Sequence, residues 1–336
     1  MKKLFILLLF FVSPFVLLSV FYVFSDPFKV IYHYDSYYID NEVNPVYLNK
    51  DHVGTQNLLN RKQERNYNSF ILGNSRSMFY EVKTWASFLD SGSNCYHLDA
   101  SAESLYGLHN KITFLDEQQF NLKNIMIVMD ENSLAKLNPG SRQLDINSPL
   151  NSKEVSAFYF QYVFFKTFFN IKFLIPYIHY KLNGNKVKDY MYNLRLLDNK
   201  YIGYNATTNE YQLTQVNNEI SEGKYYTPAK IAEFTIRYPN EYAAPCLTEA
   251  HIQLLKNMAN IFSKHNTKLK FVISPAYQQV RIDTTDLAAL KTIFGKEAVY
   301  DFSGKNDLTE SYLNFYEKIH YRPFVADSVM RYIYTH

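Results

Sequence analysis

From residue 67 onward, short apolar runs alternate with segments whose apolar residues recur every three or four positions. Uninterrupted apolar runs bounded by polar residues are typical of buried strands, and the longer spacing is typical of amphipathic helices. The predicted strands are 68–72, 95–98, 124–129, 270–273 and 299–302. The predicted helices are 78–89, 105–115, 248–262, 287–294 and 324–334. Alternating strands and helices form βαβ units, so we predict three α/β/α layers around a mostly parallel five-stranded sheet.

Two stretches lack this alternation of strand and helix patterns. Residues 26–66 are rich in Tyr, Asp and Asn and lack a clear period, so we expect an extended arm packed on the domain. Residues 137–246 form an insertion that is too long to be a simple loop and must carry structure of its own. Its aromatic part, 157–182, is interrupted by charges and predicts a buried or interfacial helix pair, with a second membrane span as the alternative. The domain itself then covers 67–336, including the insertion.

The first 25 residues carry a targeting pattern. Lys2 and Lys3 precede an apolar run over 4–24 that contains no charge. As a helix this run is about 30 Å long, enough to cross the hydrocarbon core of a bilayer. No small-x-small cleavage site follows it. We therefore expect residues 1–25 to be an uncleaved signal anchor that spans the cytoplasmic membrane once, with the remaining chain extracytoplasmic. A cleaved signal peptide is the alternative.

Composition narrows the classes of function. The 336 residues are 47% hydrophobic, which is enough for one large core or two small ones. With 35 basic and 32 acidic residues the chain lacks the basic excess of a nucleic-acid-binding protein. Only Cys95 and Cys246 are present, which argues against a thiolate zinc site, and they could pair if the chain is extracytoplasmic. The histidines show no shared metal-binding spacing, so neither a metal nor another cofactor is expected.

The clearest chemical signal is a strand that ends in small polar residues. The predicted strand 68–72 runs into Gly73, Asn74, Ser75 and Arg76. Ligands of open α/β sheets bind at the carboxyl ends of the strands, so Ser75 is placed where a nucleophile would act. The alternative is an ordinary strand-to-helix turn in which Ser75 caps the next helix.

A second stretch near the C-terminus supplies the groups that a serine nucleophile needs. Glu317 and His320 are three residues apart, so both side chains can face one pocket. Histidine can remove the serine proton, and a carboxylate orients the imidazole and stabilises its charged form. This stretch follows the last predicted strand and therefore lies at the same sheet edge as Ser75. Either residue alone could be an ordinary surface group, but together with Ser75 they predict a catalytic set.

The two motifs carry a family resemblance. Gly73-Asn74-Ser75-Arg76-Ser77, combined with Glu317-Lys318-Ile319-His320-Tyr321-Arg322-Pro323, resembles the SGNH (GDSL-type) hydrolase superfamily. More closely, the chain is similar to the membrane-anchored SGNH-like proteins of bacterial envelope polysaccharide modification. These include the alginate O-acetylation proteins and the D-alanyl transfer protein of teichoic acid synthesis. The resemblance covers about 68–130 and 248–334, and it implies a flavodoxin-like SGNH domain.

The resemblance also implies roles for individual residues. The first-block serine is the family's nucleophile, and its last block, Asp-x-x-His, supplies the base and the orienting acid. Carried over, Ser75 is the nucleophile, His320 the base and Glu317 the acid, in place of the usual Asp. Asn74 replaces the Asp of Gly-Asp-Ser and can still shape the turn.

Other positions depart further from the family pattern. Ala102 takes the place of the second-block glycine, and its backbone N–H, with that of Ser75, would face the oxyanion. The Gly-x-Asn-Asp third block is absent, and Asn132 is the nearest candidate donor. Asp130 is either structural or substrate-binding. Arg76 and Arg322 are either surface residues or cations that bind an anionic sugar or an acyl carbonyl.

The implied function is a membrane-anchored, extracytoplasmic (periplasmic or cell-surface) serine O-acyltransferase or carbohydrate esterase. It would act on O-acyl groups, such as acetyl, of cell-envelope polysaccharide through an acyl-serine intermediate. The implied partners are the polysaccharide, an acyl donor and, for transfer, a multispanning membrane acyltransferase. The residues do not separate an O-acetyltransferase from an esterase. A second hypothesis is a non-catalytic SGNH-fold envelope scaffold or glycan-binding protein, whose aromatic insertion would stack on sugars.

Overall fold

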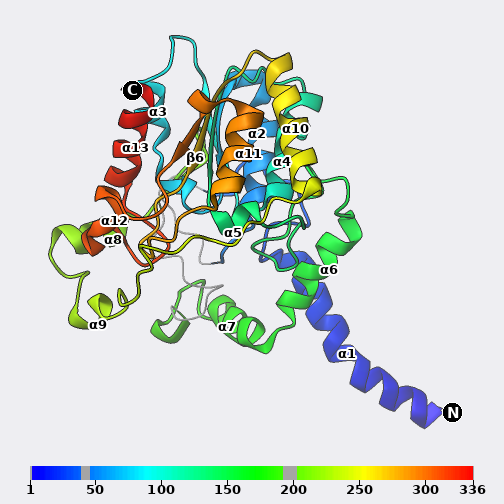
Figure 1. The fold of residues 1–336 in the computed structure, drawn as a ribbon. Helices are drawn as coiled ribbons and strands as arrows, with labels where there is room; N and C mark the ends of the chain where they lie inside the picture. The colour runs from blue at the N-terminus through cyan, green and yellow to red at the C-terminus, as the bar shows by residue number, and fades with distance from the viewer. Residues whose placement is uncertain (1, 39–45, 192–202, 336) are drawn as a thin grey trace.

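A five-stranded parallel sheet lies at the centre of the computed structural model, which describes residues 2–38, 46–191 and 203–335 (Figure 1). Its strands are β1 (Ser69–Gly73), β2 (Cys95–Asp99), β3 (Asn124–Met129), β6 (Lys268–Ile273) and β7 (Val299–Asp301). They lie in the order β2-β1-β3-β6-β7, and each adjacent pair is parallel. β1, β2 and β3 are buried along their whole length, which explains their uninterrupted apolar sequences. The five predicted strands are confirmed, each within two residues at either end.

The strand order reverses beside β1. The chain passes from β1 to β2 on one side and then to β3 on the other. Gly73 at the end of β1 is level with Asp99 of β2 and Val128 of β3, so these strands finish at one edge of the sheet. In doubly wound sheets, ligands bind in the crevice at such a switch point, outside the carboxyl ends of the strands.

Helices cover both faces of the sheet, as Figure 1 shows. One face carries α2 (Lys50–Arg65), α4 (Leu105–Glu117), α10 (Glu249–Lys264) and α11 (Thr284–Phe294), and the other carries α3 (Val82–Ala86) and α13 (Pro323–Thr335). Successive side chains of a strand point to opposite faces. Accordingly Phe70 and Leu72 join the first apolar cluster, whereas Ile71 joins the second. The predicted α/β architecture with a parallel sheet is therefore confirmed.

Shorter elements complete the fold and include one difference from the sequence prediction. They are α5 (Glu131–Leu134), α12 (Asp307–Glu310), η1 (Ser77–Phe79), η2 (Asp189–Met191), η3 (Lys296–Ala298) and η4 (Tyr312–Asn314). The single helix predicted over 78–89 is instead η1 followed by α3. Tyr80 and Glu81 between them are extended, so the chain bends there. This bend buries both Tyr80 and Trp85 completely, although their spacing would not place them on one helical face.

The segment 26–66 also differs from the extended arm expected for it, because its second half is α2. The helix begins after Asn49, whose side chain accepts the backbone N–H of His52. Several of its buried residues are polar, including Asp51, Thr55 and Asn57. A helix that buries polar side chains against other polar groups shows no apolar period, so the sequence pattern conceals it.

The described part of the insertion 137–246 contains the helices α6 to α9 and a β-hairpin. Its elements are α6 (Ala157–Phe168), α7 (Ile171–Leu182), β4 (Gly203–Asn205), β5 (Glu210–Gln212), α8 (Thr214–Ser221) and α9 (Pro228–Ile231). The helix pair predicted over 157–182 is confirmed as α6 and α7. The β4–β5 turn lies along the edge strand β2, where Thr208 accepts the backbone N–H of His97 at 2.9 Å. The hairpin therefore protects the sheet edge.

The N-terminal helix α1 (Lys2–Ser25) projects from the domain in Figure 1. None of the helices in the described part of the chain is both long and apolar enough to cross a membrane. The predicted single span over 4–24 is therefore wrong, and the extracytoplasmic location that was derived from it loses its basis. Two aromatic residues of the apolar run contact the protein: Phe15 contacts Phe169 and Tyr22 contacts Phe168, with ring centroids 4.9 and 5.0 Å apart.

Candidate active site

The turn that carries Ser75 begins at Gly73, the last residue of β1. Gly73 has a φ of +151°, and a Cβ atom there would lie 2.1 Å from the carbonyl oxygen of Val128. Only glycine fits this position, because the neighbouring strand backbone approaches so closely. The chain then turns sharply, with the Ser77 N–H donating to the Asn74 carbonyl at 2.9 Å. Ser75 lies within this turn, at the switch point of the sheet.

Ser75, His320 and Glu317 form one hydrogen-bonded chain. Ser75 Oγ lies 2.7 Å from His320 Nε2. His320 Nδ1 contacts Glu317 Oε1, and the other carboxylate oxygen accepts the Ile319 N–H at 2.9 Å. With the ring proton on Nδ1, Nε2 is free to accept the serine proton. The side chains of His320 and Glu317 are about 70% buried, so the set remains accessible from solvent.

The surroundings of Glu317 favour its charged form. Burial alone would raise the pKa of this carboxyl group. The hydrogen bond and charge of His320, the Ile319 N–H and the charge of Lys230 outweigh burial and lower the pKa below its usual value. Glu317 is therefore ionised at neutral pH and can stabilise a positive charge on the imidazole.

The loop that carries His320 (residues 315–322, the histidine loop) is held by backbone contacts and by an aromatic neighbour. The Tyr316 N–H donates to the His320 carbonyl at 2.9 Å, and Phe315 pairs with Tyr321 across the loop. The ring of Phe79, just after the Ser75 turn, lies 5.8 Å from the imidazole, centroid to centroid. Phe315, Tyr321 and Phe79 are all buried. The imidazole is thus oriented by packing as well as by Glu317.

Two tyrosines of the insertion support the same loop. Tyr225 donates its hydroxyl to the carbonyl of Tyr316 at 2.8 Å, and Tyr226 donates to that of Phe315 at 2.7 Å. Loops depend on such side-chain partners when their carbonyl groups lie outside regular structure. One function of the insertion is therefore to fix the position of the histidine loop.

Arg76 links the Ser75 turn to its neighbours, and its side chain is buried rather than on the surface. Its Nη1 lies 2.9 Å from Asp130 Oδ2, and its Nε donates to the Ile319 carbonyl at 3.0 Å. The Asn74 amide donates to Asp130 and, at 2.8 Å, to Ser133. Asp130 also caps α5 by accepting the Ser133 N–H. Arg76, Asn74 and Asp130 thus join the ends of β1 and β3 to the histidine loop.

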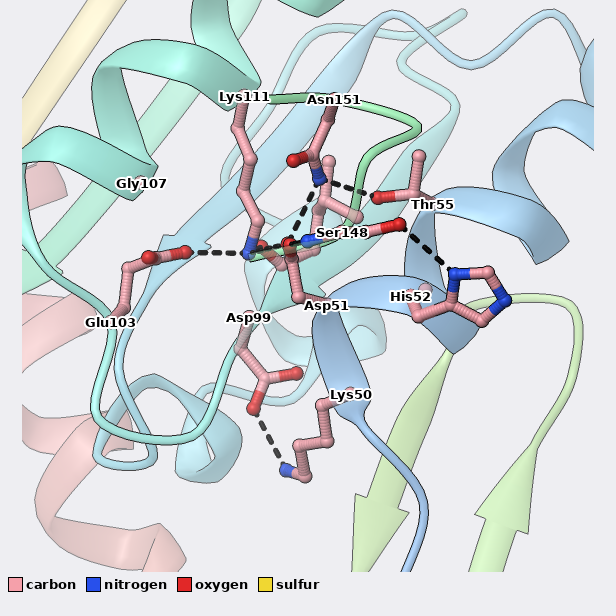
Figure 2. Close-up of polar contacts among 12 residues, drawn as sticks. Lys50, Asp51, His52, Thr55, Asp99, Glu103, Gly107, Lys111, Ser148 and Asn151 are labelled. Carbon is pink, nitrogen blue, oxygen red and sulfur yellow. Dashed lines mark hydrogen bonds and ion pairs between the residues drawn. The ribbon is translucent and has the colours of Figure 1, made fainter. Parts of the chain in front are cut away.

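The loop after β2 is attached to a buried ionic cluster beneath it (Figure 2). Lys111 of α4 is fully buried, with Nζ 3.0 Å from Asp51 and 2.6 Å from Glu103. Burial would lower the pKa of Lys111, but the two carboxylates outweigh burial and raise it. Asp51 also accepts the Ser148 N–H at 2.6 Å, so the cluster connects α2, α4 and the insertion.

This loop contains Ala102, the candidate second oxyanion donor. At its start, the Ala100 N–H donates to the Gly73 carbonyl at 3.1 Å, and at its end Glu103 is held by Lys111. Ala102 itself is exposed and has a φ of +52°, a left-handed conformation that favours glycine. Within the described ranges, the N–H groups of Ala102 and Ser75 donate to no protein acceptor.

Two predicted residues are not brought to Ser75. Asn132 is exposed, and its amide donates to the Glu131 carboxylate at 3.1 Å. Arg322 donates to the Leu313 carbonyl at 3.2 Å and lies over the ring of Phe324. Arg322 therefore braces the histidine loop from outside, and Asn132 has no contact with the serine in the part of the chain described here.

Sequence reasoning missed a polar layer under the Ser75 turn. Ser77 donates to the Asn74 carbonyl at 2.7 Å, and His97 Nε2 lies 3.2 Å from Ser77 Oγ. His97 and Lys111 are fully or almost fully buried. Two features of the sequence could have indicated this layer: His97 lies inside an apolar predicted strand, and Lys111 lies on the apolar face of a predicted helix. Such positions are populated only when the polar group has a partner.

Within residues 2–38, 46–191 and 203–335, no three His, Cys, Asp or Glu side chains are grouped so as to hold a metal ion. Cys95 and Cys246, whose pairing the sequence left open, are both free thiols. No protein-family model matches the chain. No curated protein matches it either. Inference about function therefore rests on the geometry of this site.

Proposed function

We propose that this protein is a serine-dependent acyl-ester enzyme that works through an acyl-Ser75 intermediate. The observation that carries the proposal is the chain Ser75 Oγ–His320 Nε2, 2.7 Å long, continued from His320 Nδ1 to Glu317. A nucleophile, a base and an orienting acid in this order are the parts required for acyl transfer through serine. Their position at the switch point of a parallel sheet supports the finer proposal of a flavodoxin-like SGNH fold.

In the first half-reaction, Ser75 Oγ attacks the carbonyl carbon of an acyl ester as His320 Nε2 takes the hydroxyl proton. The tetrahedral intermediate collapses, the bond to the leaving alkoxide breaks, and His320 returns the proton to the leaving oxygen. Glu317 remains ionised throughout and stabilises the imidazolium. The backbone N–H groups of Ser75 and Ala102 are the proposed oxyanion donors, and loss of one such donor typically costs about 3–4 kcal/mol in the barrier.

In the second half-reaction, a hydroxyl group or water gives its proton to His320 and attacks the acyl-serine. The products are a new ester or a carboxylic acid, and Ser75 recovers its proton from His320. The same intermediate serves transfer and hydrolysis. From the resemblance, the proposed substrates are O-acyl groups, such as acetyl, on a polysaccharide, with an acyl donor and a partner acyltransferase in the case of transfer.

The proposal is tested with a fluorophosphonate probe, which labels activated serines covalently. The native protein should be labelled at Ser75, as read by peptide mass spectrometry. Ser75→Ala and His320→Gln should each abolish labelling. Ser87→Ala is the matched control, because Ser87 is exposed and lies outside the site. Equal labelling of the native and Ser75→Ala proteins, or none of either, would contradict the proposal and favour the non-catalytic scaffold.

A further inference from the structure

A pocket of about 160 Å³ lies beside the candidate catalytic set. Three parts of the chain line it: the segment after the Ser75 turn, with Phe79 and Glu81; the insertion, with Glu210, Asn217 and Asn218; and the histidine loop, with Tyr316. A cavity of roughly 150 Å³ can hold one benzene molecule, so this pocket has room for about one six-membered ring.

The pocket shares a wall with the catalytic histidine. Phe79 lines the pocket and also packs against the His320 imidazole. Tyr316 lines the pocket as well, and its N–H donates to the His320 carbonyl at 2.9 Å. The ring centroids of Phe79 and Tyr316 lie 5.5 Å apart. Ser75, His320 and Glu317 do not themselves line the pocket, so a group bound there would be separated from the imidazole by one layer of side chains, Phe79 and Tyr316.

The polar groups of the pocket are acids and amides. None of the residues that line it is a lysine, arginine or histidine. In the described structure, the side chains of Glu81 and Asn218 make no hydrogen bond, and Asn217 uses only its oxygen, which accepts from Tyr316. Carboxylates accept hydrogen bonds and amides both donate and accept them, so these groups match hydroxyl and amine substituents. The aromatic walls match the apolar face of a ring.

The charges around the pocket disfavour anions. Glu210 accepts the Val82 N–H at 2.7 Å and lies at one side of the pocket, while Glu81 is exposed. Two cations act on residues of the pocket wall. Lys50 lies over the ring of Tyr211 but is paired with Asp99 at 2.8 Å, and the charge of Arg322 acts on Tyr316 while its Nη1 donates to the Leu313 carbonyl at 3.2 Å. A carboxylate or phosphate in the pocket would therefore face two acids, while both cations already contact other groups.

We propose that this pocket binds one sugar ring that carries no carboxylate or phosphate, namely a neutral sugar or an amino sugar. The inference rests on the proposed function in one respect, because the ring would belong to the molecule that gives or receives the acyl group at Ser75. The pocket would select among sugar rings by charge, which the catalytic residues themselves do not do. Acidic sugars such as uronic acids are excluded by Glu81 and Glu210.

The test uses full-length Ser75→Ala protein, so that binding is measured without turnover. Isothermal titration calorimetry is done with three tetramers, of N-acetylglucosamine, glucosamine and galacturonic acid. The first two should bind, and the galacturonic acid tetramer should bind about tenfold more weakly or worse. Adding Glu81→Lys should reverse the order of the glucosamine and galacturonic acid tetramers. Adding Asn218→Ala should weaken all binding without changing the order.

Glu297→Lys is the matched charge reversal, because Glu297 is exposed and precedes β7 at the opposite edge of the sheet. It should leave all three affinities unchanged. Equal or tighter binding of the galacturonic acid tetramer, an unchanged order in the Glu81→Lys protein, or no binding of the first two tetramers would each overturn the inference. Fluorophosphonate labelling of Ser75 is independent of these results. A labelled protein that binds no tetramer therefore refutes the pocket but not the enzyme.

Discussion

At the scale of single residues, the charge of Glu317 can be removed without changing the shape of its side chain. It contacts His320 Nδ1 with one oxygen and the Ile319 N–H with the other. Its pKa is lowered because the contacts with His320 and the Ile319 N–H outweigh burial. A neutral amide could keep the shape of these contacts, but it could not balance the charge that forms on the imidazole when Ser75 gives up its proton.

Glu317→Gln should therefore lower kcat for hydrolysis of an acyl ester by about 10³-fold or more, with little change in KM. The measurement is steady-state hydrolysis of p-nitrophenyl acetate at pH 7.5, together with the rate of fluorophosphonate labelling. Glu310→Gln is the control, since Glu310 also precedes the loop that carries His320 but forms ion pairs with Lys305 and Arg237 rather than with the imidazole. If kcat stays within about threefold of the native value, Glu317 is not the orienting acid.

The sequence predicted Ser75, His320 and Glu317 because each residue type has a specific role and each follows a strand end. It did not distinguish between the alternatives for Arg76 and Asp130. Whether such residues face solvent or each other depends on how close the ends of β1 and β3 lie. A local sequence pattern does not give that distance. Both residues are buried and contact each other at 2.9 Å, a pairing that the sequence did not predict.

At the scale of elements, the Lys111 cluster determines how α2, α4 and the loop after β2 fit together. A fully buried lysine with two carboxylates leaves strong charges unbalanced if one partner is removed. The same cluster explains why α2 was not predicted. Its buried residues include the polar Asp51 and Thr55 as well as apolar ones, and the partners of these polar side chains are far away in the sequence.

Lys111→Met should lower the free energy of unfolding by about 3–5 kcal/mol, because Asp51 and Glu103 remain buried without their cation. Urea denaturation followed by circular dichroism measures this change. Lys153→Met is the matched control, since Lys153 pairs with Glu117 on the exposed surface and should change stability by less than about 1 kcal/mol. Similar losses for the two variants would show that the buried cluster does not stabilise the fold.

At the scale of the whole molecule, the sheet was predictable because its central strands are buried on both faces. Their apolar runs need no partner to be recognised, and β3 was predicted with its observed ends. The N-terminal prediction failed for a related reason. An apolar run does not by itself say what covers it: Tyr22 of α1 is buried against α6, whereas Phe10, Phe11 and Leu17 of the same helix are exposed.

Buried histidines should make the stability of the whole chain depend on pH. Burial is the main cause that lowers the pKa of His52 and of His97 to about 4 each, although Asp51 and Asp99 oppose it. In the unfolded chain both pKa values return to about 6.5. Between pH 6.5 and 4 the unfolded state therefore binds more protons, and the free energy of unfolding falls as the pH falls. The loss by pH 4 is on the order of 3 kcal/mol for each histidine.

Urea denaturation at pH 7.0, 5.5 and 4.5 should accordingly show a steady loss of stability in the native protein. The double variant His52→Gln/His97→Gln should start from a lower stability at pH 7.0 but lose much less on acidification, because glutamine does not titrate. His33→Gln is the control, since the His33 side chain is 59% exposed and its replacement should leave the native pH dependence in place. Carboxylates contribute to acid sensitivity in all three proteins, so the comparison is between slopes rather than absolute values. Equal slopes for the native protein and the double variant would show that the two imidazoles do not control acid stability.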